Sequence, residues 1–226
     1  MKTIISTQDD CLNGAAAHVR RLLAEKPDAV IALSAMDDAL MLYRELAGEQ
    51  SLSKARLFSV AEFESGEGPA ICHDRLRAAL AATGAREGNC VFLSEENAGD
   101  YDARIAAEGG LDLAVLGIGV NARVGLNEPA TPYASRTHRQ KLAPATRREL
   151  AGLFGGEEKV PEYGLTMGIK TLVEAKEVLL IAFGEIRAKA VFDMLYGRDD
   201  STVPAAFLQL PPNVTVYLDE SAAAKL

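Results

Sequence analysis

The stretch that decides the fold is LDLAVLGIGVNARVGLNEP, residues 111–129. It opens with a short apolar run, Leu111–Leu116, which is typical of a buried strand in a parallel sheet. Gly117 and Gly119 then turn the chain out of the sheet. Four polar residues follow on the predicted loop: Asn121, Arg123, Asn127 and Glu128. Ligands of open α/β sheets bind at the carboxyl ends of the strands, so this loop is a candidate site.

Two other interpretations of the same stretch have to be weighed. Glycines after a strand are common in α/β proteins, and the polar residues could form a solvated loop without a ligand. A dinucleotide site is disfavoured, because Ala122 stands where the third glycine of G-x-G-x-x-G belongs. No acidic residue lies near the position, about twenty residues on, where a ribose would be held.

Composition limits the class of protein. The chain has 226 residues, 48% of them hydrophobic, and we expect a single domain over 1–226. A net charge of −8 without a basic block argues against nucleic acid and anionic membranes as partners. No apolar run has the length of a membrane-spanning helix, and the N-terminal apolar stretch is too short for a signal peptide.

Cysteine and histidine usage gives no sign of a metal site. Cys11, Cys72 and Cys90 have no C-x-x-C spacing and are predicted to be free thiols in a reducing cytoplasm. The three histidines are scattered along the sequence, which gives a histidine metal cluster little support.

Strands and helices are predicted to alternate along most of the chain, which is the pattern of an α/β, doubly wound, mainly parallel sheet. The predicted strands are Ala29–Leu33, Arg56–Val60, Cys90–Leu93, Leu111–Leu116, Val178–Phe183 and Val214–Leu218. The predicted helices are Asp9–Glu25, with Thr7 as its cap, and Asp37–Ala47, Ile71–Ala82, Asp100–Glu108, Ala145–Phe154 and Ile186–Tyr196. Ser65–Pro69 is predicted to be a loop, Tyr133–Leu142 irregular, Gly164–Ala175 a short helix or turn, and Ala205–Leu210 a short element.

Several motifs in order resemble the amino-sugar 6-phosphate deaminase/isomerase family. They are GLDLAVLGIG and GLNEP around the central strand, ASRT (residues 134–137), LTMGIKTLVEAKEVLLIAFG (165–184) and AAFLQLPPN (205–213). The galactosamine-6-phosphate isomerases are the nearest likeness. The resemblance implies a Rossmann-like three-layer fold and a cytoplasmic enzyme without metal or organic cofactor. It also implies a small-molecule sugar or sugar phosphate as partner, and leaves a homo-oligomer open.

The family's catalytic base is an aspartate in a motif like F-N-x-D-E-Y, and here the sequence departs from it. The matching run is FSVAEF, residues 58–63, which places Ala61 at the base position. An alanine accepts no proton. Glu62 is the next residue and is the candidate replacement for the base, although a shift of one residue usually turns a side chain elsewhere.

A second departure lies in the motif that resembles D-G-H-I-A-F-N-E-P. Arg123 takes the place of the ring-opening histidine, and a guanidinium group does not exchange protons near neutrality. Arg123 could instead bind a carboxylate or phosphate. Asn121 also occurs in galactosamine-type members, Asn127 is a candidate substrate ligand, and Glu128 is the strongest titratable candidate.

A third departure is the phosphate loop, which matches Ser34–Asp38 and lacks the family's glycines and Thr-Pro pair. Asp37 and Asp38 are expected to stabilise the start of a helix, by about 0.3–1 kcal/mol each, and to repel a phosphate placed there. Ser34 remains a candidate substrate ligand. Arg187 replaces the family's phosphate-contacting lysine, and Arg136 and Lys141 are further candidate cations.

Three hypotheses follow. The first is that the chain is an active amino-sugar-phosphate isomerase or deaminase that uses Glu128, Glu62 and Asn121, with Arg187 helping to bind the phosphate. Alternatively it is a catalytically impaired member that binds a sugar or sugar acid as a sensor or partner. The third alternative is an enzyme with the same fold and a different, non-phosphorylated substrate, with Arg123 and Arg136 facing a carboxylate.

Overall fold

A seven-stranded parallel sheet forms the centre of the computed structural model, which describes residues 1–48, 52–64, 70–198 and 201–226. Its strand order is β1-β10-β9-β6-β2-β3-β5, and every adjacent pair is parallel. The strands are β1 (Lys2–Ser6), β2 (Val30–Leu33), β3 (Arg56–Ser59), β5 (Cys90–Val91), β6 (Leu113–Leu116), β9 (Glu177–Ala182) and β10 (Val214–Asp219). The fourth of the seven is β6, so the strand expected at the centre of the sheet is confirmed.

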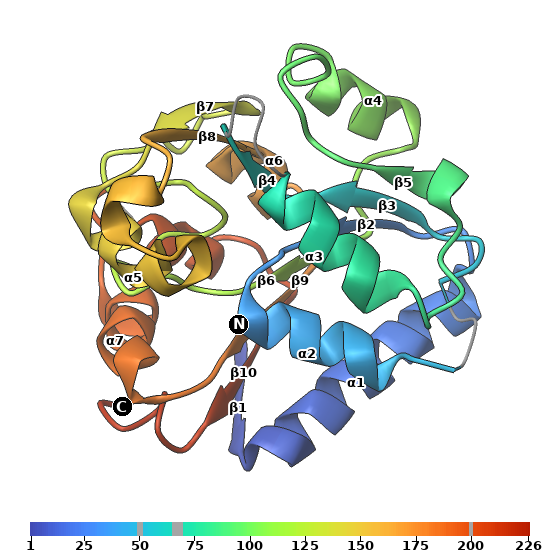
Figure 1. Ribbon diagram of the computed structural model, residues 1–226. Coiled ribbons are helices and arrows are strands. Elements are labelled where there is room, and N and C mark those ends of the chain that lie inside the picture. The colour runs from blue at the N-terminus through green and yellow to red at the C-terminus, as the bar shows by residue number, and fades with distance from the viewer. Residues whose placement is uncertain (49–51, 65–69, 199–200) are drawn as a thin grey trace.

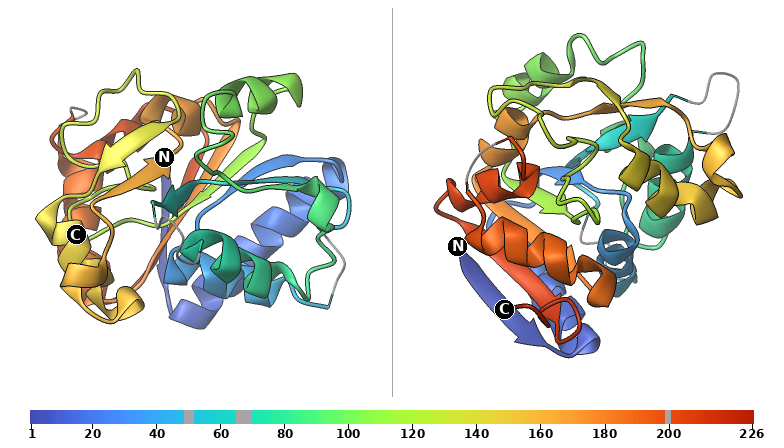
Figure 2. Two further views of the ribbon diagram at one scale, coloured as in Figure 1. Left: turned by 45° about the horizontal axis from the view of Figure 1, so that its top comes forward. Right: turned by 90° about the vertical axis from the view of Figure 1, so that its left-hand side faces the viewer.

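Helices cover both faces of this sheet, as the three-layer prediction requires (Figures 1 and 2). On one face, α1 (Gln8–Glu25), α2 (Asp37–Glu45) and α3 (Ile71–Leu80) bury apolar side chains against the strands. On the other face, the core contains side chains of α4 (Tyr101–Ala107), α6 (Ile169–Val173), α7 (Ala188–Tyr196) and the 3-10 helix η4 (Pro204–Gln209). Figure 1 shows α1, α2 and α3 together on one side and α5 (Pro144–Phe154) and α7 on the other.

The ends of two helices follow the predicted chemistry. Thr7 precedes α1, and its side-chain oxygen accepts a hydrogen bond of 3.2 Å from the backbone N–H of Asp10. Gly155 ends α5 in the left-handed conformation, with φ of 73°. Three further 3-10 turns are η1 (Glu87–Asn89), η2 (Glu157–Lys159) and η3 (Glu185–Arg187).

A second, antiparallel sheet was not predicted. It has the order β4-β8-β7 and consists of β4 (Ala61–Phe63), β8 (Tyr163–Thr166) and β7 (His138–Lys141). The segment expected to be irregular therefore contains β7, and the expected short helix or turn at 164–175 consists of most of β8 together with α6. The edge strand β1 was also missed, because its five residues are mostly exposed and form no buried apolar run.

Three further observations bear on the sequence predictions. Cys11, Cys72 and Cys90 are free thiols, as expected. The predicted loop Ser65–Pro69 lies outside the described residues. No helix within the described ranges combines the length and the apolar character that a membrane span requires.

Candidate active site

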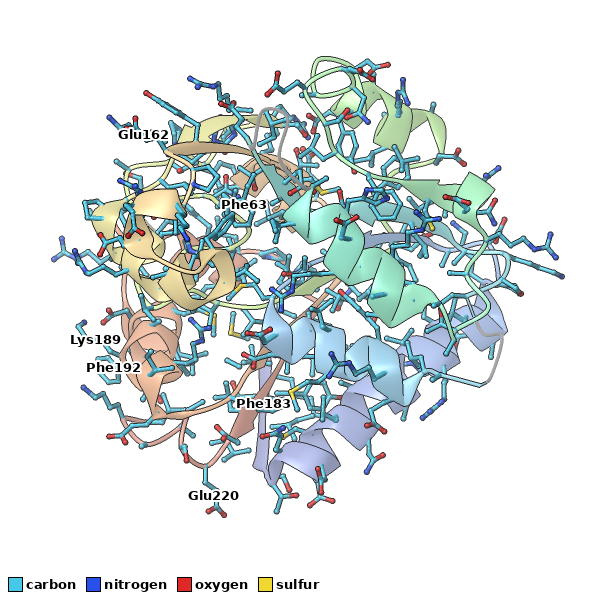
Figure 3. The ribbon with its side chains drawn as sticks, viewed as in Figure 1. Phe63, Glu162, Phe183, Lys189, Phe192 and Glu220 are labelled. Atoms are coloured by element: carbon cyan, nitrogen blue, oxygen red, sulfur yellow. The ribbon has the colours of Figure 1, made fainter. Side chains whose placement is uncertain are left out.

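A cavity of about 350 Å³ opens at the carboxyl ends of β2, β3 and β6. The strand order reverses between β2 and β6, so this is the switch point at which open α/β sheets bind ligands. The lining comes from the segments after these strands and from α3, α5 and η3: Ser34–Asp37, Val60, Ala61, Phe63, Cys72, Arg75, Arg123, Gly125, Leu126, Glu149, Leu150, Gly152, Leu153 and Arg187. Phe63, labelled in Figure 3, packs edge-on against Phe154 of α5 with 5.2 Å between ring centroids.

A larger and more open groove of about 650 Å³ lies at the other end of the sheet, where β9 and β10 begin. Its lining includes Lys2, His18 and Glu177. The amino ends of the strands are not where open α/β sheets hold their ligands, and the predicted site residues lie elsewhere. The smaller cavity is therefore the candidate active site.

The glycines of the loop after β6 allow close packing around the cavity. A Cβ on Gly117 would lie 3.0 Å from Sδ of Met36, and a Cβ on Gly119 would lie 2.5 Å from Cγ of Arg123. Gly125 has a φ of +58°, which favours glycine. The sequence therefore uses glycine at 119 to leave room for the arginine side chain.

Arg123 is the largest side chain buried in the described structure and is only 2% exposed. Its Nη1 donates to the carbonyl of Gly125 at 2.6 Å, and its Nη2 donates to Oε2 of Glu149 at 3.4 Å. Its buried Nε has no hydrogen-bond partner. The prediction that Arg123 lies in the site is consistent with this position in the cavity wall.

Arg187 also lines the cavity, and its Nη1 donates to the other carboxylate oxygen, Oε1 of Glu149. The same carboxylate accepts the backbone N–H of Val120 at 3.2 Å. Glu149 thus links two arginines that lie 64 residues apart in sequence. Sequence reasoning missed Glu149, because a single acid on an amphipathic helix is usually solvent-exposed.

The two aspartates at the start of α2 have partners that the sequence did not predict. Asp37 forms an ion pair with Arg75 of α3, which offsets its charge. Asp38 accepts the backbone N–H of Phe183 at 3.3 Å. Burial raises the pKa of Asp38 to about 6, and the nearby Arg187 opposes this effect. The ion pair with Arg75 therefore reduces the expected repulsion of a phosphate by Asp37, whereas Asp38 still carries most of its negative charge at neutral pH. Ser34 lines the cavity, with its Oγ accepting from the N–H of Met36 at 3.2 Å.

Glu62 does not occupy the position of a base. Its carboxylate accepts the backbone N–H groups of Phe63 at 2.8 Å, Cys72 at 3.0 Å and His73 at 2.8 Å, and so it caps the start of α3. Ala61 lines the cavity, whereas the neighbouring Glu62 does not. Neighbouring side chains of a strand point to opposite sides, so Ala61 faces the cavity and Glu62 faces away from it. The structure therefore does not support the predicted role of Glu62 as the base.

Asn121 and Glu128 contact each other and lie outside the cavity lining. Nδ2 of Asn121 donates to Oε2 of Glu128 at 2.6 Å, and the backbone N–H of Ala143 donates to Oε1 at 3.1 Å. Glu128 is buried, and neither residue is part of the cavity lining. The structure brings these two predicted catalytic residues into contact with each other but places neither in the lining of the cavity.

Asn127 and Arg136 have structural contacts outside the cavity. Nδ2 of Asn127 donates to the carbonyls of Val124 and Met167, both at 2.8 Å, and so ties the loop to the end of β8. Arg136 forms an ion pair with Glu174 on the surface beside α6. The structure therefore does not support their prediction as substrate ligands. Lys141 lies in β7, also outside the lining.

Comparison with known proteins places this geometry in context. No protein-family model matches the chain. The glucosamine-6-phosphate deaminase of Mycolicibacterium smegmatis is 36% identical over 227 residues, which cover 94% of this chain and 87% of the relative. The glucosamine-6-phosphate deaminase of Clostridium acetobutylicum is 31% identical over 236 residues, which cover 98% of each.

Solved structures agree with these relatives. A monomeric glucosamine-6-phosphate deaminase, described as a missing link of the NagB superfamily, has a TM-score of 0.93 and 29% identity, with full coverage of both chains. The 6-phosphogluconolactonase from Trypanosoma cruzi has a TM-score of 0.79 and 18% identity, and covers 100% of this chain and 96% of its own. The fold is thus the three-layer α/β fold of the NagB and 6-phosphogluconolactonase class. Within that class, the chain belongs to the glucosamine-6-phosphate deaminase family.

Proposed function

We propose that the protein is an amino-sugar-phosphate isomerase/deaminase of carbohydrate metabolism that takes glucosamine 6-phosphate or galactosamine 6-phosphate into the cavity. The observation that carries this proposal is the pair of arginines, Arg123 and Arg187, in the wall of a cavity at the switch point of the sheet. A volume of about 350 Å³ is in the range of small-molecule sites. The relatives named glucosamine-6-phosphate deaminases match over nearly the whole chain, which supports the same class of substrate.

The reaction requires proton transfer between C2 and C1 of the opened sugar. General acid–base groups typically contribute about 10²–10⁴-fold to such a rate. Ala61 lines the cavity at the position of the family's base, and both carboxylates in the lining, Asp37 and Glu149, are paired with arginines. We therefore expect turnover that is slow by about that factor.

The alanine at position 61 and the arginine at position 123 favour a second candidate function. In this alternative the protein is a family member that binds the sugar phosphate without turning it over. The methyl group of Ala61 cannot accept a proton, and the guanidinium of Arg123 cannot release one near neutrality. Such a protein would serve as a sensor or as a partner subunit.

A turnover assay separates the two candidates. The purified protein is incubated with each amino-sugar phosphate, and ammonia and ketose phosphate are measured together with thermal stabilisation by the ligand. Product formation that is lost in Arg187→Gln supports the enzyme, and ketose without ammonia identifies an isomerase. Stabilisation without product supports the binding protein. Neither product nor stabilisation rejects both.

We further propose that the protein acts in the cytoplasm. Its three cysteines are free thiols, which is usual in a reducing compartment. Assembly into a homo-oligomer stays a prediction.

A further inference from the structure

The carboxylate of Glu149 lies between Arg123 and Arg187, the two arginines that an anionic ligand of the cavity would contact. It accepts from Nη2 of Arg123 at 3.4 Å and from Nη1 of Arg187, and its side chain is 9% exposed. All three side chains line the cavity. The protein thus carries its own carboxylate between the two arginines that a phosphate would use.

The charged side chains of the cavity lining leave at most a single positive unit, because Asp38 outside the lining also lies near Arg187. Asp37 and Arg75 balance each other, and Glu149 neutralises one of the two remaining arginines. The Nε of Arg123 has no hydrogen-bond partner, but it is buried beside Gly119 and adds no donor on the cavity side. One positive unit matches a monoanion, whereas a phosphate monoester near neutral pH carries about 1.5 to 2 negative charges.

We propose that Glu149 is a specificity-determining residue that lowers the affinity of the cavity for dianionic phosphate relative to a monoanionic group such as the carboxylate of a sugar acid. This inference rests on the proposed function, because it takes the cavity to be the sugar-binding site. Glu149 acts by holding Arg123 and Arg187 together and by occupying their anion position.

The test compares how a change at Glu149 affects the binding of ligands that carry different charges. Coulomb energy is proportional to ligand charge, so removal of the Glu149 charge changes the binding free energy of a dianion about twice as much as that of a monoanion. A loss of packing alone would weaken both ligands without this difference. The ratio of the two affinities therefore reports a specificity role and not a structural one.

The experiment measures dissociation constants for inorganic phosphate, at a pH where it is mainly dianionic, and for gluconate by calorimetric titration. In Glu149→Gln we expect phosphate to bind about tenfold tighter and gluconate about threefold tighter than in the unmodified protein. The matched control is Glu174→Gln, which removes a carboxylate paired with Arg136 outside the cavity and should change neither constant. An unchanged phosphate-to-gluconate ratio in folded Glu149→Gln overturns the inference.

A second variant keeps the test decisive if Glu149→Gln does not fold. Glu149→Gln is then made in an Arg123→Gln background, where it leaves only Arg187 without its carboxylate, and relative to Arg123→Gln alone phosphate should tighten about tenfold and gluconate about threefold. An unchanged ratio in this variant also overturns the inference. Turnover of the amino-sugar phosphates is measured separately: turnover with unchanged ratios leaves the proposed function standing and removes the role of Glu149. Shifted ratios without turnover keep the role of Glu149 and favour the sugar-phosphate-binding protein over the enzyme.

Discussion

The carboxylate of Asp112 lies 2.6 Å from Nζ of Lys26, at the end of the sheet opposite the cavity. The same buried carboxylate accepts Nζ of Lys176 at 2.8 Å and the backbone N–H of Val30 at 2.8 Å. Burial opposes the charge of the carboxyl, but the hydrogen bonds from Lys176 and Lys26 outweigh it, and the pKa of Asp112 lies below its ordinary value. Asp112 therefore connects the amino-terminal ends of β2, β6 and β9.

Asp112→Asn should lower the free energy of unfolding at neutral pH by about 1–3 kcal/mol, because buried hydrogen bonds to charged groups are weakened. The folded-state pKa is below the unfolded one, so this stabilisation is present above the unfolded pKa and is lost as pH falls through the folded pKa. Urea unfolding at about pH 7 and about pH 3 should show a difference that shrinks in acid.

The control for Asp112 is Asp193→Asn. Asp193 pairs with Lys189 one turn away on α7, and Figure 3 shows Lys189 on the outer side of that helix. Exposed pairs of this kind contribute about 0.3–0.5 kcal/mol. An equal loss in the two variants would show that the buried position of Asp112 does not matter.

Asp38 should show the opposite pH dependence. Burial raises its pKa from 3.8 to about 6, with Arg187 opposing, so the folded protein loses stability as pH rises from about 4 to about 6. The difference between these two pKa values corresponds to at most about 3 kcal/mol, which partial exposure reduces to about 1–2 kcal/mol. Asp38→Asn should therefore be more stable than the unmodified protein by that amount at about pH 8 and about equally stable at about pH 4. Thermal unfolding at both pH values checks this, and a gain of equal size at both would contradict it.

The parallel sheet could be predicted because its inner strands carry a simple signal. The four residues of β2 and the four of β6 are all buried, and burial on both faces produces the continuous apolar runs from which they were predicted. The second sheet has no such signal. The four residues of β7 are HRQK, and β4 has only three residues, so their pairing depends on β8, about a hundred positions beyond β4.

The site was predicted in part, for a related reason. Ser34, Arg123 and Arg187 follow strands, and the carboxyl ends of strands meet at one edge in any parallel sheet, so the fold alone brings them together. The partner of the two arginines lies on α5, and its contact depends on how that helix packs over the cavity. Glu62 and Glu128 accept hydrogen bonds from backbone N–H groups at the starts of α3 and α5, which gives both carboxylates a structural role. No sequence pattern predicts these long-range hydrogen bonds.

Glu62→Gln tests whether that carboxylate is a cap or a base. If Glu62 is a cap, its change to an amide should lower the free energy of unfolding by about 0.5–2 kcal/mol and leave kcat within about tenfold of its original value. Loss of a base would lower kcat by about 10²–10⁴-fold instead. Glu64→Gln is the matched control, because Glu64 pairs with Arg139 and does not cap α3. A large fall of kcat in Glu62→Gln alone would return Glu62 to the catalytic machinery.

Ala61→Asp should restore the missing base. Ala61 lines the cavity together with Arg75 and Arg123, whose positive charges favour the ionised form of a carboxylate placed beside them. We expect kcat for the amino-sugar phosphate to rise by about 10²–10⁴-fold. Combination with Arg123→His supplies a group that titrates near neutrality, and a further rise should follow.

Ala61→Asn is the control for this gain, because asparagine has nearly the shape of aspartate and accepts no proton from carbon. Steady-state kinetics of the three variants therefore separate the base from a change in cavity shape. Equal rates in Ala61→Asp and Ala61→Asn, with ligand binding retained, would mean that a carboxylate at position 61 does not reach the C2 proton. The impairment would then lie in the Arg123–Glu149–Arg187 contacts, which set where the sugar phosphate is held, and the missing base would not be its cause.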